Sequence, residues 1–445
     1  MTADTIAAIS TAVGEAAISV LRVSGPQAIT IADKVFRGRK SVASMRPRFA
    51  NLGSIVDAEG AVIDHAMLTL YRSPASYTGE DLVELHCHGG ILVTQKVLGV
   101  LLHHGARQAD AGEFTQRAFL NGKMDLTQAE AVMDLIHAHS TLAMRAANEQ
   151  LEGAIGREAE AMRGELIQVL AHIEAYIDFP DEDIAPETGD ALIARIDSML
   201  ARAGRLLATS EHGRILRSGA RTVICGQPNV GKSSLLNLLS GFERAIVSPV
   251  AGTTRDTIEE FIQVHGIPLR LVDTAGLRES GDAIEQSGIE RTNREMERAD
   301  LILKVVDASL PRGALASPAT LRRIVVLNKC DLPRDPSWKD VAGIAVSCAT
   351  GAGLDDLRAA IRDLVLHGGQ IASDHPVAIN ARHKSCFERM TARLNAARAA
   401  MIQKTAPEFV ALDLRDAMQA LGEVVGLVDG ELVLDAIFAQ FCIGK

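Results

Sequence analysis

Apolar residues in the first 118 positions form short alternating runs. One run is "AAISVLRVSG", and a later one, "LGSIVDAEGAVIDHAMLTLY", is interrupted by Glu59 and Gly60, which favour a hairpin turn. The intervening "PQAITIADKVF" has the spacing of a short helix. Strands mixed with a helix predict an N-terminal α+β domain over residues 1–118.

Helical spacing follows in two separate parts of the chain, residues 119–213 and 373–445. Thr127 and Glu130 have the spacing of a capping box and predict a helix start there. Because both parts are helical, we expect them to form one bundle. Apolar positions recur three and four residues apart in 166–177, 193–207, 387–401 and 410–421.

Residues 214–372 alternate short apolar strands with helical stretches. The strands include "RTVICG", "LRLVDTAG", "LILKVVDAS" and "RRIVVLNKCD". This order predicts a mostly parallel sheet covered on both faces by helices. Since the ends of a domain often lie close together, we expect this α/β domain to be inserted into the helical bundle.

Charge and cysteine content narrow the classes of function. The chain has 46 basic and 56 acidic residues and a formal charge of −10, so the whole molecule does not attract nucleic acid. RNA contact must therefore be local or supplied by a partner.

The six cysteines form no CxxC pair, and disulfides are not expected. The N-terminus lacks a signal-like apolar core and no long apolar run follows, so we expect a cytoplasmic protein without a membrane span.

The segment "GQPNVGKSS" follows a predicted strand and satisfies the phosphate-loop pattern G-x-x-x-x-G-K-[ST]. Gly226 and Gly231 let backbone N–H groups approach phosphates, Lys232 can neutralise the β and γ oxygens, and Ser233 can bind Mg²⁺. A glycine-rich turn without a ligand is the alternative, and the motifs that follow argue against it.

Those motifs occur in the order that a GTPase needs. Asp273 of "DTAG" and Thr254 of "GTTRD" can serve the metal, and the Gly276 N–H can sense the γ-phosphate. Asp331 of "NKCD" can accept two hydrogen bonds from guanine, which adenine cannot offer. The predicted fold is therefore a Ras-like P-loop G domain. The predicted GTP-binding residues are Asn229, Val230, Gly231, Lys232, Ser233, Ser234, Ser248, Thr253, Thr254, Asp273, Thr274, Ala275, Gly276, Asn328, Lys329, Asp331, Ser347, Cys348 and Ala349.

Leu277 follows the "DTAG" motif, where small switch GTPases carry a glutamine that orients water. Hydrolysis therefore needs another arrangement. Arg255 and Arg278 can be aimed at the phosphates or can be solvated surface residues. The side-chain oxygen of Asn229 could instead hold a monovalent cation that stabilises the developing charge.

Several segments together resemble one family. They are "GQPNVGKS", "VAGTTRD", "DTAGLRES" and "NKCD", with "AGEFTQRAFLNGKMDLTQAEAVMDLI", "FPDED" and the terminal "FCIGK". The chain resembles the bacterial tRNA modification GTPase family MnmE, also called TrmE, among the potassium-dependent TrmE/Era-type GTPases. The resemblance extends over nearly the whole chain, and residues 111–136 and the tail make it specific.

The resemblance implies potassium-stimulated GTP hydrolysis, a homodimer formed through the N-terminal domains, and pairing of G domains during turnover. It assigns Glu285 to orient the attacking water, although spacing alone favours a helix-surface acid. Ser248 stands where the family usually has Thr. The implied metal ligands are Ser233 and Thr254 for magnesium, and Asn229, Ser248, Val250 and Thr253 for potassium.

The same resemblance implies a partner and a product. With the flavin- and NADH-using protein MnmG (GidA), in a heterotetramer or larger assembly, the family adds an aminomethyl or carboxymethylaminomethyl group to C5 of the wobble uridine of certain tRNAs. Contact with tRNA is expected mainly through that partner.

The family also binds 5-formyltetrahydrofolate or a related tetrahydrofolate in its N-terminal domain as the one-carbon donor. By motif position the ligand is held by Arg22, Glu84, Lys123 and Lys445. A carboxylate can bond the amide-amino edge of the pterin, and cations can meet the glutamyl carboxylates. Each of the four, taken singly, could equally be a surface charge.

Two cysteine motifs leave alternatives. "HCHGG" suggests a metal site, but no further ligand set stands at a convincing spacing, so packing is favoured. Cys442 fits the C-a-a-X prenylation pattern only in outline, because Gly444 is not aliphatic. The family resemblance gives this cysteine a catalytic part in the RNA modification and not in GTP hydrolysis.

Two other functions share some of these features. A ribosome-assembly GTPase, a switch without modification chemistry, would carry the same G motifs, but no KH-type GXXG loop is present. Folate binding would distinguish the family function from that of a ribosome-assembly GTPase. The interpretation as a lipid-anchored signalling GTPase is supported only by the position of Cys442.

Overall fold

The computed structural model describes residues 4–178, 189–242, 260–272, 295–313, 322–366, 378–427 and 431–444. The chain divides into two units, one formed by Met1–Met133 with Gly422–Lys445 and the other by Asp134–Leu421. The C-terminal tail therefore belongs with the N-terminal domain and not with the helices that precede it in sequence.

The first unit contains a seven-stranded sheet in the order β3-β4-β5-β6-β2-β1-β7. Its pairs are antiparallel except for β1 with β7. The predicted turn at Glu59 and Gly60 is confirmed, because Gly60 has a φ of 86° between β4 and β5. The strands are β1 (Ile6–Ile9), β2 (Ala16–Ser24), β3 (Phe36–Gly38), β4 (Ala50–Val56), β5 (Val62–Tyr71), β6 (Leu82–Gly89) and β7 (Arg107–Gln108).

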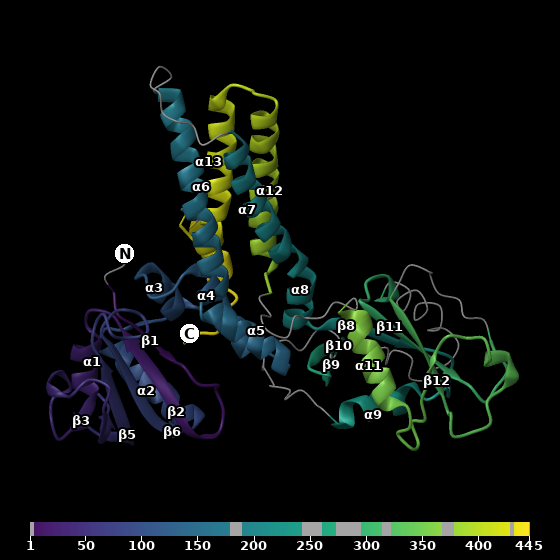
Figure 1. Ribbon diagram of the computed structural model, residues 1–445. Coiled ribbons are helices and arrows are strands. Elements are labelled where there is room, and N and C mark those ends of the chain that lie inside the picture. The colour runs from purple at the N-terminus through teal and green to yellow at the C-terminus, as the bar shows by residue number, and fades with distance from the viewer. Residues whose placement is uncertain are drawn as a thin grey trace, which may run out of the picture. The chain divides into compact units, whose positions relative to one another are not determined.

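One face of this sheet is covered by α1 (Ala28–Val35) and α2 (Ile91–His103) (Figure 1). Successive strand residues point to opposite faces. In β6, Leu85 and Cys87 enter the core with Leu21 of β2, whereas Glu84 lies on the opposite face. The sheet thus presents charged side chains on the face that α1 and α2 leave open.

Three more helices complete this unit, α3 (Glu113–Leu120), α4 (Leu126–Ile136) and α14 (Glu431–Phe438), together with the short η1 (Val42–Ser44). The capping box predicted at Thr127 and Glu130 is wrong. Because α4 begins at Leu126, Asp125 caps it: its Oδ1 accepts from the Gln128 N–H at 2.9 Å, and Gln128 Oε1 accepts from the Asp125 N–H at 3.0 Å.

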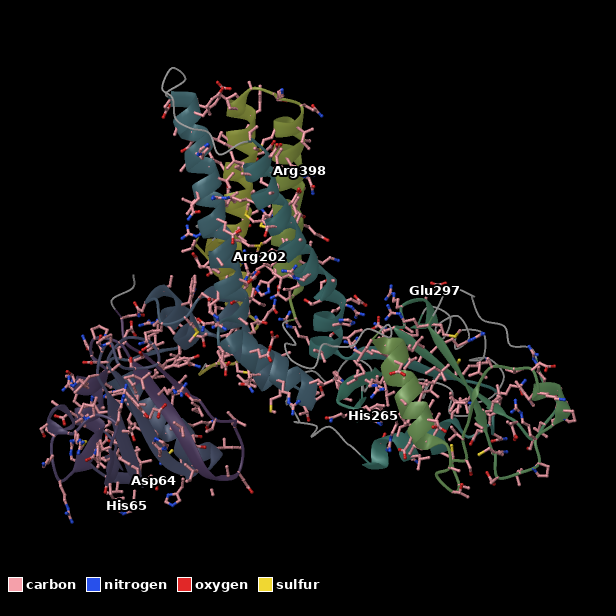
Figure 2. All side chains as sticks on the ribbon, viewed as in Figure 1. Asp64, His65, Arg202, His265, Glu297 and Arg398 are labelled. Atoms are coloured by element: carbon pink, nitrogen blue, oxygen red, sulfur yellow. The ribbon has the colours of Figure 1, made fainter. Side chains whose placement is uncertain are left out.

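The second unit contains the predicted bundle (Figure 1), in which helices from before and after the G domain lie side by side. Side chains across the helices are paired: Arg202 Nε donates to Glu158 at 2.7 Å, and Arg398 Nε donates to Asp197 at 2.6 Å (Figure 2). The helices are α5 (Thr141–Leu151), α6 (Ala154–Asp178), α7 (Gly189–Ala208), α8 (Ser210–Ser218), α12 (Ala381–Ile402) and α13 (Pro407–Val425).

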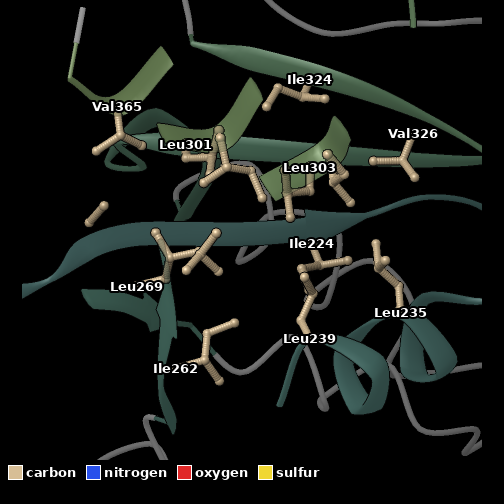
Figure 3. Close-up of a cluster of buried hydrophobic side chains, with 14 of the residues drawn as sticks. Ile224, Leu235, Leu239, Ile262, Leu269, Leu301, Leu303, Ile324, Val326 and Val365 are labelled. Carbon is tan, nitrogen blue, oxygen red and sulfur yellow. The ribbon is translucent and has the colours of Figure 1, made fainter. Parts of the chain in front are cut away.

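The inserted domain has a six-stranded sheet in the order β13-β12-β11-β8-β10-β9, parallel except for the β9–β10 hairpin. Apolar side chains such as Ile224, Leu239 and Leu303 fill its core (Figure 3). Its elements are β8 (Ala220–Cys225), α9 (Lys232–Phe242), β9 (Glu260–Val264), β10 (Ile267–Leu271), β11 (Leu301–Asp307), β12 (Arg323–Asn328), η3 (Pro336–Trp338), β13 (Ile344–Ala345) and α11 (Leu354–Val365).

The strand order reverses direction at β8, which has β10 on one side and β11 on the other. In open α/β sheets, ligands bind beyond the carboxyl end of the strands at such a point. Among the described residues no helix is both long enough and apolar enough to cross a membrane.

Candidate functional site

The phosphate loop joins β8 to α9 and approaches its neighbours closely. A Cβ at Gly226 would stand 2.2 Å from the Val305 carbonyl oxygen, and one at Gly231 would stand 2.2 Å from Asn328 Nδ2. Asn229 has a left-handed φ of 61°, an uncommon conformation for a residue with a side chain. The loop is therefore a closely packed cradle, and both glycines are required by contact with the rest of the site.

The Lys232 ammonium is folded back onto this loop. Lys232 Nζ donates to the Gly226 carbonyl at 3.1 Å and to the Gln227 carbonyl at 2.7 Å. Burial lowers the pKa of Lys232, and the nearby Lys304 adds to this effect. A cation held among carbonyl oxygens at a helix N-terminus fits the binding of anionic phosphates.

Ser233, Ser234 and Asn229 are exposed in the loop and the first turn of α9, while Val230 is buried beneath them. A hydroxyl in that turn is a suitable magnesium ligand, and an exposed amide oxygen suits a monovalent cation. These roles stay predictions.

Asn328 links the phosphate loop to the "SCATG" segment, one of the two segments predicted to bind the base. Its side chain is buried, Nδ2 donates to the Val230 carbonyl at 2.8 Å, and Oδ1 accepts from the Cys348 N–H at 3.1 Å. Ser347 is also buried, and its Oγ accepts from the Thr350 N–H at 3.2 Å. The structure thus brings the "NKCD" and "SCATG" segments together beside the phosphate loop, with Asp331 and Ala349 exposed.

Asp307 is a residue of this site that the sequence analysis missed. It ends β11 opposite Asn328, and its Oδ2 lies 2.5 Å from Lys329 Nζ. Its other oxygen accepts from the Ser309 N–H at 3.0 Å and from Ser309 Oγ at 2.6 Å. Burial raises the pKa of Asp307, but hydrogen bonds from Lys329 and Ser309 outweigh it and leave the pKa lowered. The only sequence signal was an acidic residue at the end of the predicted strand "LILKVVDAS".

Several predicted site residues lie outside the described residues. They are Ser248, Val250, Thr253, Thr254, Asp273, Thr274, Ala275, Gly276, Glu285 and Lys445, as well as Arg255 and Arg278.

In the first unit, the structure brings Arg22 and Glu84 together. They are cross-strand partners on β2 and β6, and Arg22 Nε donates to Glu84 Oε1 at 2.9 Å. Tyr71 donates its hydroxyl to Glu84 Oε2 at 3.2 Å, and the Arg22 guanidinium lies 5.4 Å from the centre of the Tyr77 ring. Both charged side chains are less than one-fifth exposed. This half-buried carboxylate with donors on both oxygens lies on the open face of the sheet.

Lys123 lies beside the loop that precedes β6. Its Nζ donates to the Pro74 carbonyl at 3.0 Å, and a Cβ at Gly79 would stand 3.4 Å from its side chain. Lys123 therefore contacts a loop that leads directly into the strand of Glu84.

The C-terminal tail returns to the same domain. The Gly112 N–H donates to the Cys442 carbonyl at 3.3 Å, and Ile443 forms an antiparallel bridge with Ala111. Gly444, with a φ of 96°, lies so close to β1 that a Cβ would stand 2.4 Å from the Ile9 carbonyl. Since β1 pairs with β2, the tail ends one strand away from Arg22, and Cys442 is exposed.

In the "HCHGG" segment Cys87 is buried, whereas the side chain of His88 is 74% exposed. Burial raises the pKa of the Cys87 thiol to about 11, so it remains protonated in the core. His88 Nδ1 lies 2.7 Å from Asp64 Oδ1, and the His88 N–H donates to Asp64 Oδ2. Among the described residues there is no group of three or more His, Cys, Asp or Glu side chains placed to hold a metal ion.

A parallel sheet with a phosphate loop at its switch point and an "NKCD" motif beside it defines a P-loop GTPase. The particular family follows from comparison with known proteins. A family model described as the MnmE helical domain matches residues 126–442, and one described as the GTP-binding protein TrmE N-terminus matches residues 5–123.

Full-length relatives agree with these models. The tRNA modification GTPase MnmE of Akkermansia muciniphila is 54% identical over 445 residues, covering 99% of each chain, and that of Geobacter sulfurreducens is 45% identical over 453 residues with the same coverage. The chain belongs to the MnmE (TrmE) family and is a GTPase that takes part in tRNA modification.

Among solved structures, a variant of Era from Aquifex aeolicus bound to GDP and aluminium fluoride is 27% identical. It covers 39% of this chain and 66% of its own, with a TM-score of 0.27.

Proposed function

We propose that this GTPase works with MnmG (GidA) to add an aminomethyl or carboxymethylaminomethyl group to C5 of the wobble uridine of certain tRNAs, with a tetrahydrofolate as one-carbon donor. Residues Arg22, Glu84, Lys123 and Lys445 hold the folate. Cys442 acts in the modification and not in GTP hydrolysis.

The paired carboxylate of Glu84 is the observation that best supports folate binding. Its two oxygens point to adjacent donors, Arg22 and Tyr71, in the way that a carboxylate can meet the two neighbouring donors of a pterin edge. The tail's contact with β1 brings the C-terminus to the same domain. A ribosome-assembly switch would have no need of this arrangement.

On the GTP side, Ser233 would hold magnesium with Thr254, and Asn229 would hold potassium with Ser248, Val250 and Thr253. Magnesium would neutralise phosphate charge and potassium would stabilise the charge that develops on hydrolysis. Lys232 would turn from the loop carbonyls to the phosphates, and Glu285 would orient water. The exposed Asn229 amide at a left-handed position supports the cation role.

A homodimer through the first unit is part of the proposal. Apolar side chains are exposed on the open face of the sheet, with Ile18 62%, Leu52 72% and Met67 43% exposed. Leu52 and Met67 are cross-strand partners on β4 and β5, and Ile18 lies on β2, beyond β6. Exposed apolar side chains on one face are typical of an interface. Sedimentation of the full chain should give a dimer, and Leu52→Asp should give monomers that still hydrolyse GTP.

Folate binding is tested by calorimetry with 5-formyltetrahydrofolate and the full chain. Glu84→Gln should weaken binding about tenfold or more, because the variant loses a charge-assisted pair of hydrogen bonds. The matched control is Glu160→Gln. Glu160 is the carboxylate partner of Arg163 on α6, so this variant also takes the negative charge away from an arginine, but outside the first unit. Equal affinities for both variants would contradict the folate site.

The modification itself is tested by nucleoside analysis of tRNA from cells lacking this protein. Wobble uridines should lose the C5 group, and cells carrying Cys442→Ser should lose it while GTP turnover of the purified variant stays normal. Unaltered wobble uridines in the deletion strain would refute the proposed function.

A further inference from the structure

The first unit carries a concentrated positive charge that the folate and GTP sites do not use. Between positions 34 and 48 the chain has six basic residues and no acidic one, although its overall formal charge is −10. We name this group the basic edge, and it consists of Lys34, Arg37, Arg39, Lys40, Arg46 and Arg48.

The basic edge lies at one border of the seven-stranded sheet. β3 is the terminal strand in the sheet order, and the end of α1 and the short η1 flank it in sequence. All six side chains are exposed. The charge is therefore displayed together on one border and not distributed over the unit.

These cations are not neutralised by neighbours. Within the described part of the chain, none of the six forms a salt bridge; Arg37 donates to the Asp33 carbonyl at 3.0 Å and Arg48 donates to the Ala75 carbonyl at 3.1 Å. The guanidinium of Arg46 lies over the ring of Phe49, 4.0 Å from its centre. Backbone carbonyls and a ring orient three of the four arginines but leave their charge available.

The positive potential reaches the neighbouring helix end. Burial lowers the pKa of His104 at the end of α2, and His103, Lys34 and Arg37 lower it further. Those two cations must therefore lie close enough to His104 for their charge to act on it.

Two ordinary roles do not account for six cations. Lys34, in the last turn of α1, can interact with the helix dipole, and basic residues on an edge strand prevent aggregation. β3, however, has only three residues, and Arg46 and Arg48 lie beyond it. Arg48 also has a left-handed φ of 64°, a conformation that is costly for a side-chain-bearing residue.

The composition favours RNA over a lipid surface. Four of the six are arginines, whose planar guanidinium groups bind phosphate oxygens in pairs and stack on bases. Phe49, 49% exposed beneath Arg46, adds an aromatic surface suited to an unstacked base. We propose that the basic edge binds the phosphate backbone of the tRNA substrate directly, an inference that rests on the proposed function and supplements contact through the partner.

The test uses the full chain and an unmodified tRNA transcript, with affinity measured by fluorescence anisotropy between 50 and 200 mM KCl. The variant Arg39→Ala/Lys40→Ala/Arg46→Ala should bind at least about tenfold more weakly at the lowest salt. The slope of log affinity against log salt should fall by about 2, because three phosphate contacts are lost. GTP turnover should be unchanged.

The matched control is Arg145→Ala/Arg205→Ala/Lys404→Ala, which removes the same charge from exposed positions of the second unit, two in helices and one in the turn after α12. It should bind tRNA like the unaltered chain. Equal losses of tRNA affinity in the two triple variants, or no tRNA binding by the unaltered chain, would overturn the proposal. So would a variant that keeps tRNA affinity but loses binding to phosphatidylserine vesicles.

Failure of this inference differs from failure of the proposed function. If tRNA affinity is unaffected by the triple variant while wobble uridines still need this protein, only the basic edge is refuted. If the edge binds tRNA and wobble uridines are unaltered in the deletion strain, only the modification role is refuted.

Discussion

Lys329 has a left-handed backbone with a φ of 62°, so the "NKCD" motif, which we expect to bind guanine, has a strained residue. The ammonium of Lys329 is fixed by the buried Asp307, which is itself fixed by Ser309. A lysine held in this way keeps its aliphatic chain in one place beside the predicted base pocket. Asp307 is therefore a positioning residue for Lys329.

We expect Asp307→Asn to raise the dissociation constants for both GTP and GDP about tenfold, the effect of losing a hydrogen bond between charged groups worth ~1.5 kcal/mol. The rate at saturating GTP should not change, because Asp307 acts on the base motif and not on the phosphates. Fluorescent nucleotide titration and steady-state turnover separate the two effects.

Asp335 provides the control within the same domain. It accepts from the Ser337 N–H at 2.9 Å and from Ser337 Oγ at 2.5 Å, the same turn that Asp307 makes with Ser309, but among the described residues it has no lysine partner. Asp335→Asn should leave nucleotide affinity unchanged. If both variants weaken nucleotide binding equally, Asp307 acts by stabilising its turn with Ser309 and not by positioning Lys329.

Sequence predicted the motif residues but not their partners. The phosphate loop can be predicted because its glycines and lysine follow one another within nine residues, "GQPNVGKSS". Asp307 could not, since it meets Lys329 only through the parallel pairing of β11 with β12. Likewise the spacing did not reveal that Arg22 and Glu84 face each other, because the register of β2 and β6 is set by the whole sheet.

At the scale of elements, α3 is held by a partly buried network of charges. Arg117 of α3 donates to Asp4 Oδ1 at 2.7 Å and to Glu113 Oε1 at 2.9 Å, and Glu113 also accepts from Arg107 Nη2 at 2.6 Å. Glu113 and Arg117 are each 7% exposed. Helical spacing predicted neither this network nor the true start of α4, because both depend on which polar groups become buried.

We expect Glu113→Gln to lower the free energy of unfolding of this unit by about 3 kcal/mol, because it leaves Arg107 and the buried Arg117 short of a counter-charge. Calorimetry of the full chain and hydrogen exchange across α3 measure the loss. Asp110→Asn is the control: Asp110 is 86% exposed at 3.4 Å from the same Arg107, so its loss should cost under about 0.5 kcal/mol.

The same network predicts a pH dependence. Burial opposes ionisation of Glu113, but hydrogen bonds from Arg107, the Asp110 N–H and Arg117 lower its pKa. A carboxyl whose pKa is lowered in the folded state stabilises the folded protein at pH values above its ordinary pKa. This contribution is lost as the pH falls through the pKa of the folded state. The stability difference between the unaltered chain and Glu113→Gln should therefore shrink below about pH 4. A constant difference down to pH 3 would contradict this.

At the scale of the whole molecule, the insertion of the G domain could be predicted because helical spacing stops at about residue 213 and resumes at about 373. The return of Gly422–Lys445 to the first unit could not, because α13 continues one helical pattern through the division between the units. Gly426 shows why the chain turns there: with a φ of 84° it lies against Phe119 and Leu126, where a Cβ would approach the Phe119 ring to 2.7 Å.

The cation dependence of turnover tests the mechanism of the entire G domain. A potassium ion beside Asn229 would supply the positive charge that an inserted arginine supplies in other GTPases, so GTP turnover should be about tenfold or more faster in K⁺ than in Na⁺ at equal ionic strength. Asn229→Gly should abolish that difference and retain nucleotide binding, since glycine adopts the left-handed φ of 61° without strain. Gln227→Ala, which removes another exposed amide from the same loop, should keep the difference between the two salts.

Equal rates in the two salts for the unaltered chain would show that the charge comes from another group, and Arg255 and Arg278 would then be the side chains to replace.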